Sequence, residues 1–159
     1  MRKIVRLIAP LVTVSLAISS LAADEFKWIG QITEDGSALS YAIPQSDAIK
    51  LDFHCERKTR NIIVNFEHEP KNAKDGMQVT MRFSVRGRDA GISADIPATG
   101  RRSELDDKFI FQGNIRMSPQ LRRILSEGGT LLVAIAGQTE EIPLKGIAGA
   151  GRQLFASCP

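Results

Sequence analysis

The chain has 159 residues, with 21 Lys or Arg, 18 Asp or Glu and a formal net charge of +3. This length suffices for one domain with a sizeable hydrophobic core. The net charge comes from three basic residues in the first 23 positions, so the rest of the chain carries 18 charged side chains of each sign. Nonspecific nucleic-acid binding needs a net basic surface that displaces counterions, and the sequence therefore argues against nucleic-acid partners.

The first 23 residues have the layout of a cleaved secretory signal peptide. Its basic start is formed by Arg2, Lys3 and Arg6. Residues 7–17 are mostly apolar, and small residues then lead to an expected cleavage after Ala22 or Ala23. The alternative is a retained membrane anchor, but a bilayer span needs about 20 apolar residues and this run is shorter. We therefore expect one exported domain over residues 24–159, periplasmic or secreted, without a membrane span.

Two cysteines, Cys55 and Cys158, lie in the expected exported domain. An even number of cysteines in an exported chain indicates a disulfide. A disulfide that closes a loop of about 100 residues contributes about 4–5 kcal/mol in the chain-entropy model. The alternative is a reactive or metal-binding pair, for which a C-x-x-C spacing or a neighbouring His-Cys cluster is missing. We therefore predict a Cys55–Cys158 disulfide.

Alternation of apolar and polar residues predicts a mostly β structure. The strands predicted before residue 116 cover residues 25–32, 38–43, 49–56, 61–66, 79–86, 92–96 and 109–115. Trp28 shares its parity with Phe26 and Ile32, which predicts that Trp28 lies in the core. Cys55 falls on the buried face of its strand. Residues 97–107 are polar and are predicted to form a loop.

A short helix is predicted to start at Ser118 and Pro119, because serine can cap a helix and proline suits its first position. Residues 130–136 are apolar on both parities, which predicts a central strand, and residues 141–144 form a last short strand. Apolar residues at helical spacing predict a terminal helix over residues 147–158. About eight short strands and two short helices, one of them C-terminal, indicate an antiparallel β-sandwich or a flattened barrel.

Five arginines form the candidate binding face: Arg82, Arg86, Arg88, Arg101 and Arg102. The first three share the parity opposite to the buried residues of the strand over 79–86. Basic residues gathered on one face of an uncharged domain would leave acidic residues elsewhere. Such a face would suit an anionic surface of a protein partner or an acidic glycan. The alternative is a solvated sheet face whose charges protect against edge-to-edge pairing.

The sequence contains no Gly-x-Ser-x-Gly motif, phosphate-binding loop or dinucleotide fingerprint. His54 and His68 would form a metal site only together with a carboxylate, and we expect both histidines to be solvated. The acidic pairs at residues 106–107 and 140–141 are expected in polar loops, where neighbouring side chains point apart and stay solvated. We therefore expect no catalytic residues, no metal and no cofactor.

Residues 125–158 contain a short helix, a Gly-led apolar strand and a final segment with Pro143-Leu144-Lys145-Gly146, Ala150 and Leu154. This arrangement resembles the C-terminal part of small exported alphaproteobacterial proteins, including the invasion-associated locus B family. The chain has Ile147 where that family leads us to expect Phe, and it lacks the family's additional cysteines. The resemblance implies a bacterial, exported, β-rich protein of an envelope or host-interaction type, and it carries over no functional residue.

The leading hypothesis is a non-enzymatic protein that binds another protein in the cell envelope or in a host. The signal-like leader, the single cysteine pair and the absence of a catalytic set support this hypothesis. The alternative is an inhibitor of an envelope or host hydrolase, such as a lysozyme or a protease. An inhibitor presents an ordered loop to its target, and the predicted loop at residues 97–107, with Arg101 and Arg102, is the candidate.

Overall fold

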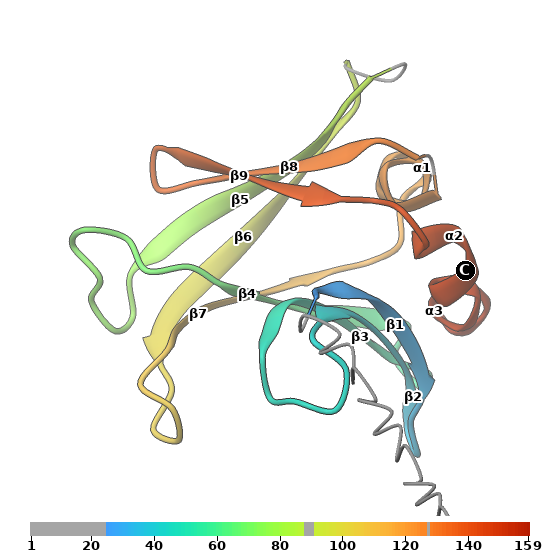
Figure 1. Cartoon of the computed structure of the whole chain (residues 1–159), viewed down its shortest axis with the longest axis horizontal. Helices are drawn as coiled ribbons and strands as arrows, with labels where there is room; N and C mark the ends of the chain where they lie inside the picture. Colours follow the sequence, from blue (N-terminus) through green and yellow to red (C-terminus); the bar gives the residue numbers. More distant parts are fainter. Residues whose placement is uncertain (1–24, 88–90, 127) are drawn as a thin grey trace, which may run out of the picture.

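The computed structural model describes residues 25–87, 91–126 and 128–159. The predicted signal peptide and Arg88 lie outside the described residues. In the described part of the chain, nine antiparallel strands form one sheet in the order β1-β2-β3-β4-β7-β6-β5-β8-β9 (Figure 1). The prediction of a mainly β, antiparallel fold is confirmed. The sheet is not closed into a barrel, because β1 and β9 remain its two edges.

Short connections join most neighbouring strands, whereas the β4–β7 and β5–β8 pairs join strands that are distant in the sequence. The strands are β1 (Lys27–Ile32), β2 (Gly36–Ala42), β3 (Ile49–Glu56), β4 (Asn61–Glu67), β5 (Gln78–Arg86), β6 (Ser93–Arg102), β7 (Phe109–Ile115), β8 (Thr130–Ile135) and β9 (Gln138–Pro143). The helices are α1 (Pro119–Ser126), α2 (Ile147–Ala150) and α3 (Arg152–Ser157). Of the described helices, none has the length and hydropathy needed to cross a membrane.

Strand β6 connects the two halves of the sheet. Its residues 93–99 pair with β5, and its residues 98–102 pair with β7. In Figure 1, β6 runs between the half formed by β1, β2, β3, β4 and β7 and the half formed by β5, β8 and β9. Phe53 of β3 meets Phe83 of β5 edge to face, with ring centroids 5.8 Å apart. The inner faces of the two halves therefore pack against each other and form the core.

The loop predicted from residue 97 onward is wrong in its first part, because β6 extends to Arg102. The loop was predicted from the polar character of this stretch, which also contains Pro97, a residue type that cannot donate to a ladder. The N–H of Gly100 donates to the carbonyl of Met77, so even-numbered residues of β6 face β5 and Pro97 faces the other way. The β7 ladder begins only at Ala98. Pro97 therefore removes no hydrogen bond from the sheet.

Three other expectations are corrected. Ile32 does not share the burial of Trp28 but is 69% exposed, because it ends an edge strand. Strand β8 is not central but lies next to the edge strand β9, and its outward residues Leu132 and Ala134 are only half-buried. The predicted terminal helix is divided into α2 and α3 at Gly151, a residue type that disfavours helix interiors.

Several local predictions are confirmed. Trp28 is 7% exposed and belongs to the core. The Ser118 hydroxyl accepts a hydrogen bond from the Leu121 N–H at 3.0 Å, so it caps α1 as predicted. Cys55 of β3 and Cys158, which follows α3, form a disulfide across a sequence separation of 103. This disulfide attaches the C-terminal helices to the sheet.

Edge strand β9 contacts the opposite half of the sheet in a region that we refer to as the seam. At one end of the seam, the Trp28 indole N–H donates to the carbonyl of Pro143 at 2.7 Å. Helix α2 packs against β1 where Gly30 leaves space, since a side chain there would meet the Ala150 carbonyl. A charged cluster, described below, connects β9 to the opposite half. Side chains and helices therefore hold the seam closed in place of a backbone ladder.

Candidate functional site

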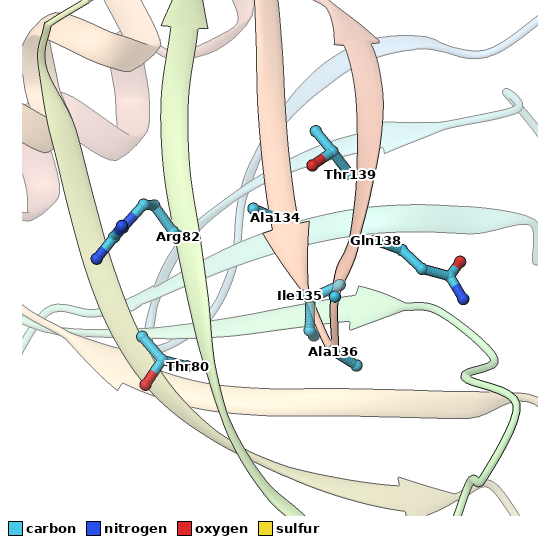
Figure 2. A pocket seen from close by; sticks show the side chains of 8 residues that line it. Thr80, Arg82, Ala134, Ile135, Ala136, Gln138 and Thr139 are labelled. Carbon is cyan, nitrogen blue, oxygen red and sulfur yellow. The ribbon is translucent and has the colours of Figure 1, made fainter.

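Two of the predicted binding-face arginines lie on the outward face of β5 and are paired with acids. Arg82 binds Asp95 of β6 in a bidentate pair at 2.7 and 2.8 Å. Arg86 binds Glu141 of β9 in the same manner at 2.8 and 2.5 Å. Figure 2 shows Arg82 on β5 beside a hollow at the end of β8. Acidic groups therefore lie among these arginines, whereas we expected them elsewhere.

Arg102 is also paired. It donates at 2.7 Å to the carboxylate of Glu69 and to the backbone carbonyl of Asp107, and it lies over the Phe109 ring at 5.5 Å. Arg101 differs, because its exposed side chain makes no hydrogen bond or ion pair with any described residue. Of the four predicted arginines that the structure describes, Arg101 is thus the one with a free guanidinium.

Arg101 borders two adjoining hollows on the outward face of the sheet. The first, of about 250 Å³, lies on β3, β4, β6 and β7, and the second, of about 500 Å³, lies at the β6–β7 loop. Arg101 and Ile110 belong to both hollows. The other lining residues are Ile49, Asp52, Asn65, Glu67 and Gln112 in the first hollow and Arg102, Ser103, Glu104 and Leu105 in the second. We refer to the two hollows together as the Arg101 surface.

A row of hydrogen-bonded side chains forms the floor of the first hollow. The sheet register places Asp52 opposite Asn65 and Asn65 opposite Gln112. Ser40 donates to Asp52 at 2.7 Å, and Gln112 donates to Asn65 at 2.9 Å. Burial raises the pKa of Asp52, although hydrogen bonds from Ser40 and Asn65 oppose the shift. A partly desolvated carboxyl group in a hollow is a candidate contact for a polar ligand group.

Apolar side chains lie at the margins of the Arg101 surface. Ile49 is 43% exposed and Leu105 is 98% exposed, and both are lining residues. Leu105 lies in the β6–β7 loop, which is ordered by a backbone hydrogen bond of 2.8 Å from Ser103 to Lys108. A free arginine flanked by exposed apolar side chains matches the composition of protein–protein interfaces, which are enriched in arginine and apolar anchors.

A β-bulge between β2 and β3 positions Lys50 in a cluster of side chains at the seam. Tyr41 pairs with Leu51 and Ala42 pairs with Ile49, so Lys50 has no partner across the β2–β3 ladder. A bulge redirects the side chain of the extra residue. Lys50 accordingly reaches inward to the seam and not outward with the polar face of β3.

The cluster consists of Lys50, His68 and Glu140. The Lys50 Nζ atom lies 2.7 Å from one Glu140 oxygen and 5.2 Å from the centroid of the Phe66 ring. The His68 Nδ1 atom forms a hydrogen bond with the other Glu140 oxygen. Glu140 and Glu141 point apart as predicted, but they lie in β9 and not in a loop. Across the residues that the structure describes, no group of three or more His, Cys, Asp or Glu side chains is placed to hold a metal ion.

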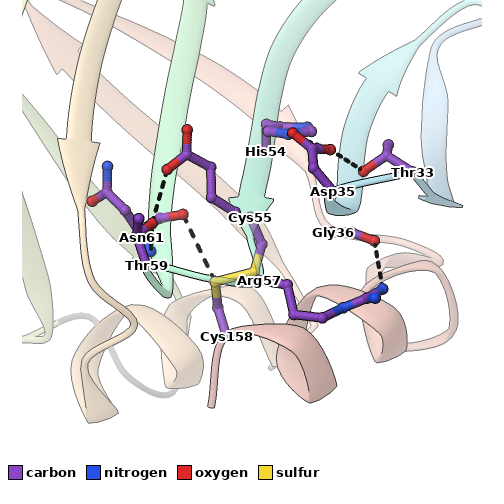
Figure 3. Close-up of polar contacts among 10 residues, drawn as sticks. Thr33, Asp35, Gly36, His54, Cys55, Arg57, Thr59, Asn61 and Cys158 are labelled. Atoms are coloured by element: carbon purple, nitrogen blue, oxygen red, sulfur yellow. Dashed lines mark hydrogen bonds and ion pairs between the residues drawn. A yellow bond between two sulfur atoms is a disulfide. The ribbon is translucent and has the colours of Figure 1, made fainter.

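His68 contradicts the expectation that both histidines are solvated, because it is only 5% exposed. It continues the inward parity of Val64 and Phe66 beyond the end of β4, and this alternation is visible in the sequence. Its Nε2 atom is buried and has no hydrogen-bond partner among the described residues. His54 lies on β3, next to Cys55 in the sequence and 3.4 Å from the Asp35 carboxylate (Figure 3).

The remaining acidic pair lies in the β6–β7 loop, as expected. Asp106 contacts Lys108 at 3.3 Å, and the side chain of Asp107 is 88% exposed.

The chain matches no protein-family model, and neither curated proteins nor solved structures yield a significant match.

The Glu140 cluster predicts a pH-dependent contribution to stability. Burial tends to raise the pKa of Glu140, but hydrogen bonds from Lys50 and His68 outweigh burial and lower the pKa. A lowered pKa stabilises the fold above the unfolded-state value of about 4.3 and loses that effect as the pH falls through the folded-state value. Glu140→Gln should therefore reduce the free energy of unfolding by about 1–3 kcal/mol at pH 7 and by less near pH 3.

Urea unfolding at the two pH values measures this difference. Glu141→Gln is the matched control, because its ion pair with Arg86 is exposed and surface pairs contribute at most about 1 kcal/mol. An equal loss of stability at both pH values for Glu140→Gln would show that the charge of Glu140 is not responsible.

Proposed function

We propose that the protein is an exported bacterial binding protein, non-enzymatic, whose protein partner docks on the Arg101 surface in the cell envelope or in a host. The observation that carries this proposal is the free guanidinium of Arg101, which borders two adjoining hollows beside the 98% exposed Leu105. Export to the periplasm or beyond is supported by the signal-like leader sequence and by the Cys55–Cys158 disulfide.

The Arg101 surface offers a partner both apolar area and polar groups. Leu105 and Ile49 offer apolar area that water leaves on docking. Arg101 supplies a charged donor that does not have to break an existing ion pair first. The row of Asp52, Asn65 and Gln112 supplies further donors and acceptors. Arg82 and Arg86 lack this advantage, because a partner would compete with the carboxylates that already hold them.

The proposal predicts that Arg101→Ala and Leu105→Ala each weaken partner binding by roughly tenfold or more, the effect of an interface hot-spot residue. Immobilised protein should first capture partners from bacterial envelope and host-cell extracts, identified by mass spectrometry. Dissociation constants of the captured partner should then be measured for each variant by surface plasmon resonance.

Ile32→Ala is the matched control, because Ile32 is a 69% exposed residue at the end of β1 and lines neither hollow of the Arg101 surface. It should change the dissociation constant by less than about twofold, the usual effect of a residue outside a hot spot. Thermal melts should show that all three variants remain folded. A partner that binds Arg101→Ala and Leu105→Ala as tightly as the unaltered protein would contradict the proposal.

A second candidate function is favoured by the order of the β6–β7 loop. Arg102 binds the Asp107 carbonyl and Lys108 contacts Asp106, so the loop that presents Leu105 is fixed at both ends. An ordered loop with an exposed apolar side chain is what a hydrolase inhibitor inserts into a target cleft. We propose inhibition of an envelope or host hydrolase as the alternative to simple protein binding.

Turnover assays with a panel of lysozymes and proteases test this alternative. The expected result is inhibition of at least one enzyme by the unaltered protein and a loss of roughly tenfold or more in inhibitory affinity for Leu105→Ala. Activity of every enzyme in the panel that is unaffected by excess protein would remove the inhibitor alternative and leave the binding proposal standing.

A further inference from the structure

Strand β5 extends beyond the neighbour that covers one of its sides. Strand β6 accompanies β5 from Gln78 onward, whereas β8 pairs with β5 only from Arg82 to Arg86. The chain turns from β8 into β9 after Ile135, so the first residues of β5 have a neighbouring strand on one side only. We refer to this exposed side of Gln78–Thr80 as the β5 step.

The direction of the backbone groups at the β5 step follows from neighbouring contacts. The carbonyl of Met77 accepts the N–H of Gly100, so odd-numbered residues of β5 face β6. Even-numbered residues face β8, in agreement with the Arg86 carbonyl, which lies close to Gly129 just before that strand. The N–H and C=O groups of Gln78 and Thr80 therefore point to the open side, and among the described residues no partner binds them.

The β5 step opens into a hollow of about 420 Å³ between Thr80 and the β8–β9 turn (Figure 2). The turn side of this hollow is lined by the small residues Ala134, Ala136 and Gly137 together with Ile135, Gln138 and Thr139. A strand that pairs with β5 would lie about 4.8 Å from it, in line with β8. The small side chains leave space for such a strand.

Edge strand β9 is protected against strand addition, and the β5 step is not. Helix α2 packs on one face of the other edge strand, β1, at Gly30. Edge strand β9 contains Pro143, whose carbonyl is taken by Trp28, and it carries the charged residues Glu140 and Glu141. Prolines, charges and covering segments are the devices that prevent strand addition at an edge. The β5 step has uncharged Gln78 and Thr80 and no covering strand, so its backbone groups stay available.

We propose that the β5 step binds an extended segment of a partner polypeptide, which adds to the sheet as a strand in line with β8. Two N–H and two C=O groups spaced along an extended strand are complemented by the backbone of another extended strand, the arrangement known from β-strand addition. Ala134, Ala136 and Gly137 leave room beside the β5 step for the side chains of such a segment. This site is separate from the Arg101 surface and does not depend on it.

The test uses a phage-displayed dodecapeptide library selected on the full exported domain. Thr80→Pro removes an N–H that faces the open side, so it removes no ladder hydrogen bond from the fold. Met81→Pro removes an N–H that faces β6 and should unfold the domain, which checks the assigned direction. Selected peptides should bind Thr80→Pro roughly tenfold or more weakly than the unaltered protein in fluorescence anisotropy. Thr80→Val keeps the backbone N–H and should bind the selected peptides as tightly as the unaltered protein.

Hydrogen exchange of the unaltered protein supplies a measurement that does not depend on the folding of a proline variant. Bound peptide should slow amide exchange at Gln78 and Thr80. Failure to select a peptide, equal binding by Thr80→Pro, or unchanged exchange at these two amides would overturn the proposal. Arg101→Ala should bind the same peptides normally, so this result is distinguishable from failure of the Arg101 surface.

Discussion

The fold depends on how an open sheet is held closed. Its two edge strands, β1 and β9, share no backbone ladder. The two halves bury their inner faces against each other, and contacts of β9 with the opposite half close the open side of the sheet. Trp28 holds one end of the seam through Pro143, and the Glu140 cluster holds another part of it. The disulfide to Cys158 keeps α3 on the sheet beside them. Each contact joins segments that are far apart in the sequence, so closure is the least local part of the structure.

This mode of closure explains where the surface is available for recognition. Contacts at the seam engage the side chains of Glu140, Lys50 and His68, and Glu140 is one of the charged residues of edge strand β9. The outward face of β3, β4, β7 and β6 takes no part in closure. It therefore keeps a partly desolvated Asp52 and a free Arg101. Because β8 ends at Ile135, the first residues of β5 keep an open side, which is the β5 step.

Local signals in the sequence predicted local structure well. Alternation identified most strands, Ser118 identified the start of α1, and the parity of Cys55 placed it on the buried face. The missing information was non-local. The strand through Pro97 depends on where β7 begins, and the inward turn of Lys50 depends on a bulge. The candidate site was predicted only in part. Arg101 was identified together with the other arginines, but the sequence did not show that the others form ion pairs across strands and that Arg101 does not.

The claim that seam contacts and the disulfide hold the sheet closed is tested most directly by amide hydrogen exchange of a Cys158→Ser variant. The account predicts local opening, in which α2, α3 and β1 lose protection while the central strands β4, β7, β6 and β5 keep theirs. Stability differs between parts of one domain when few contacts connect them, and the seam is such a boundary. Unchanged protection in α3 and β1, or an equal loss of protection in every strand, would contradict this account.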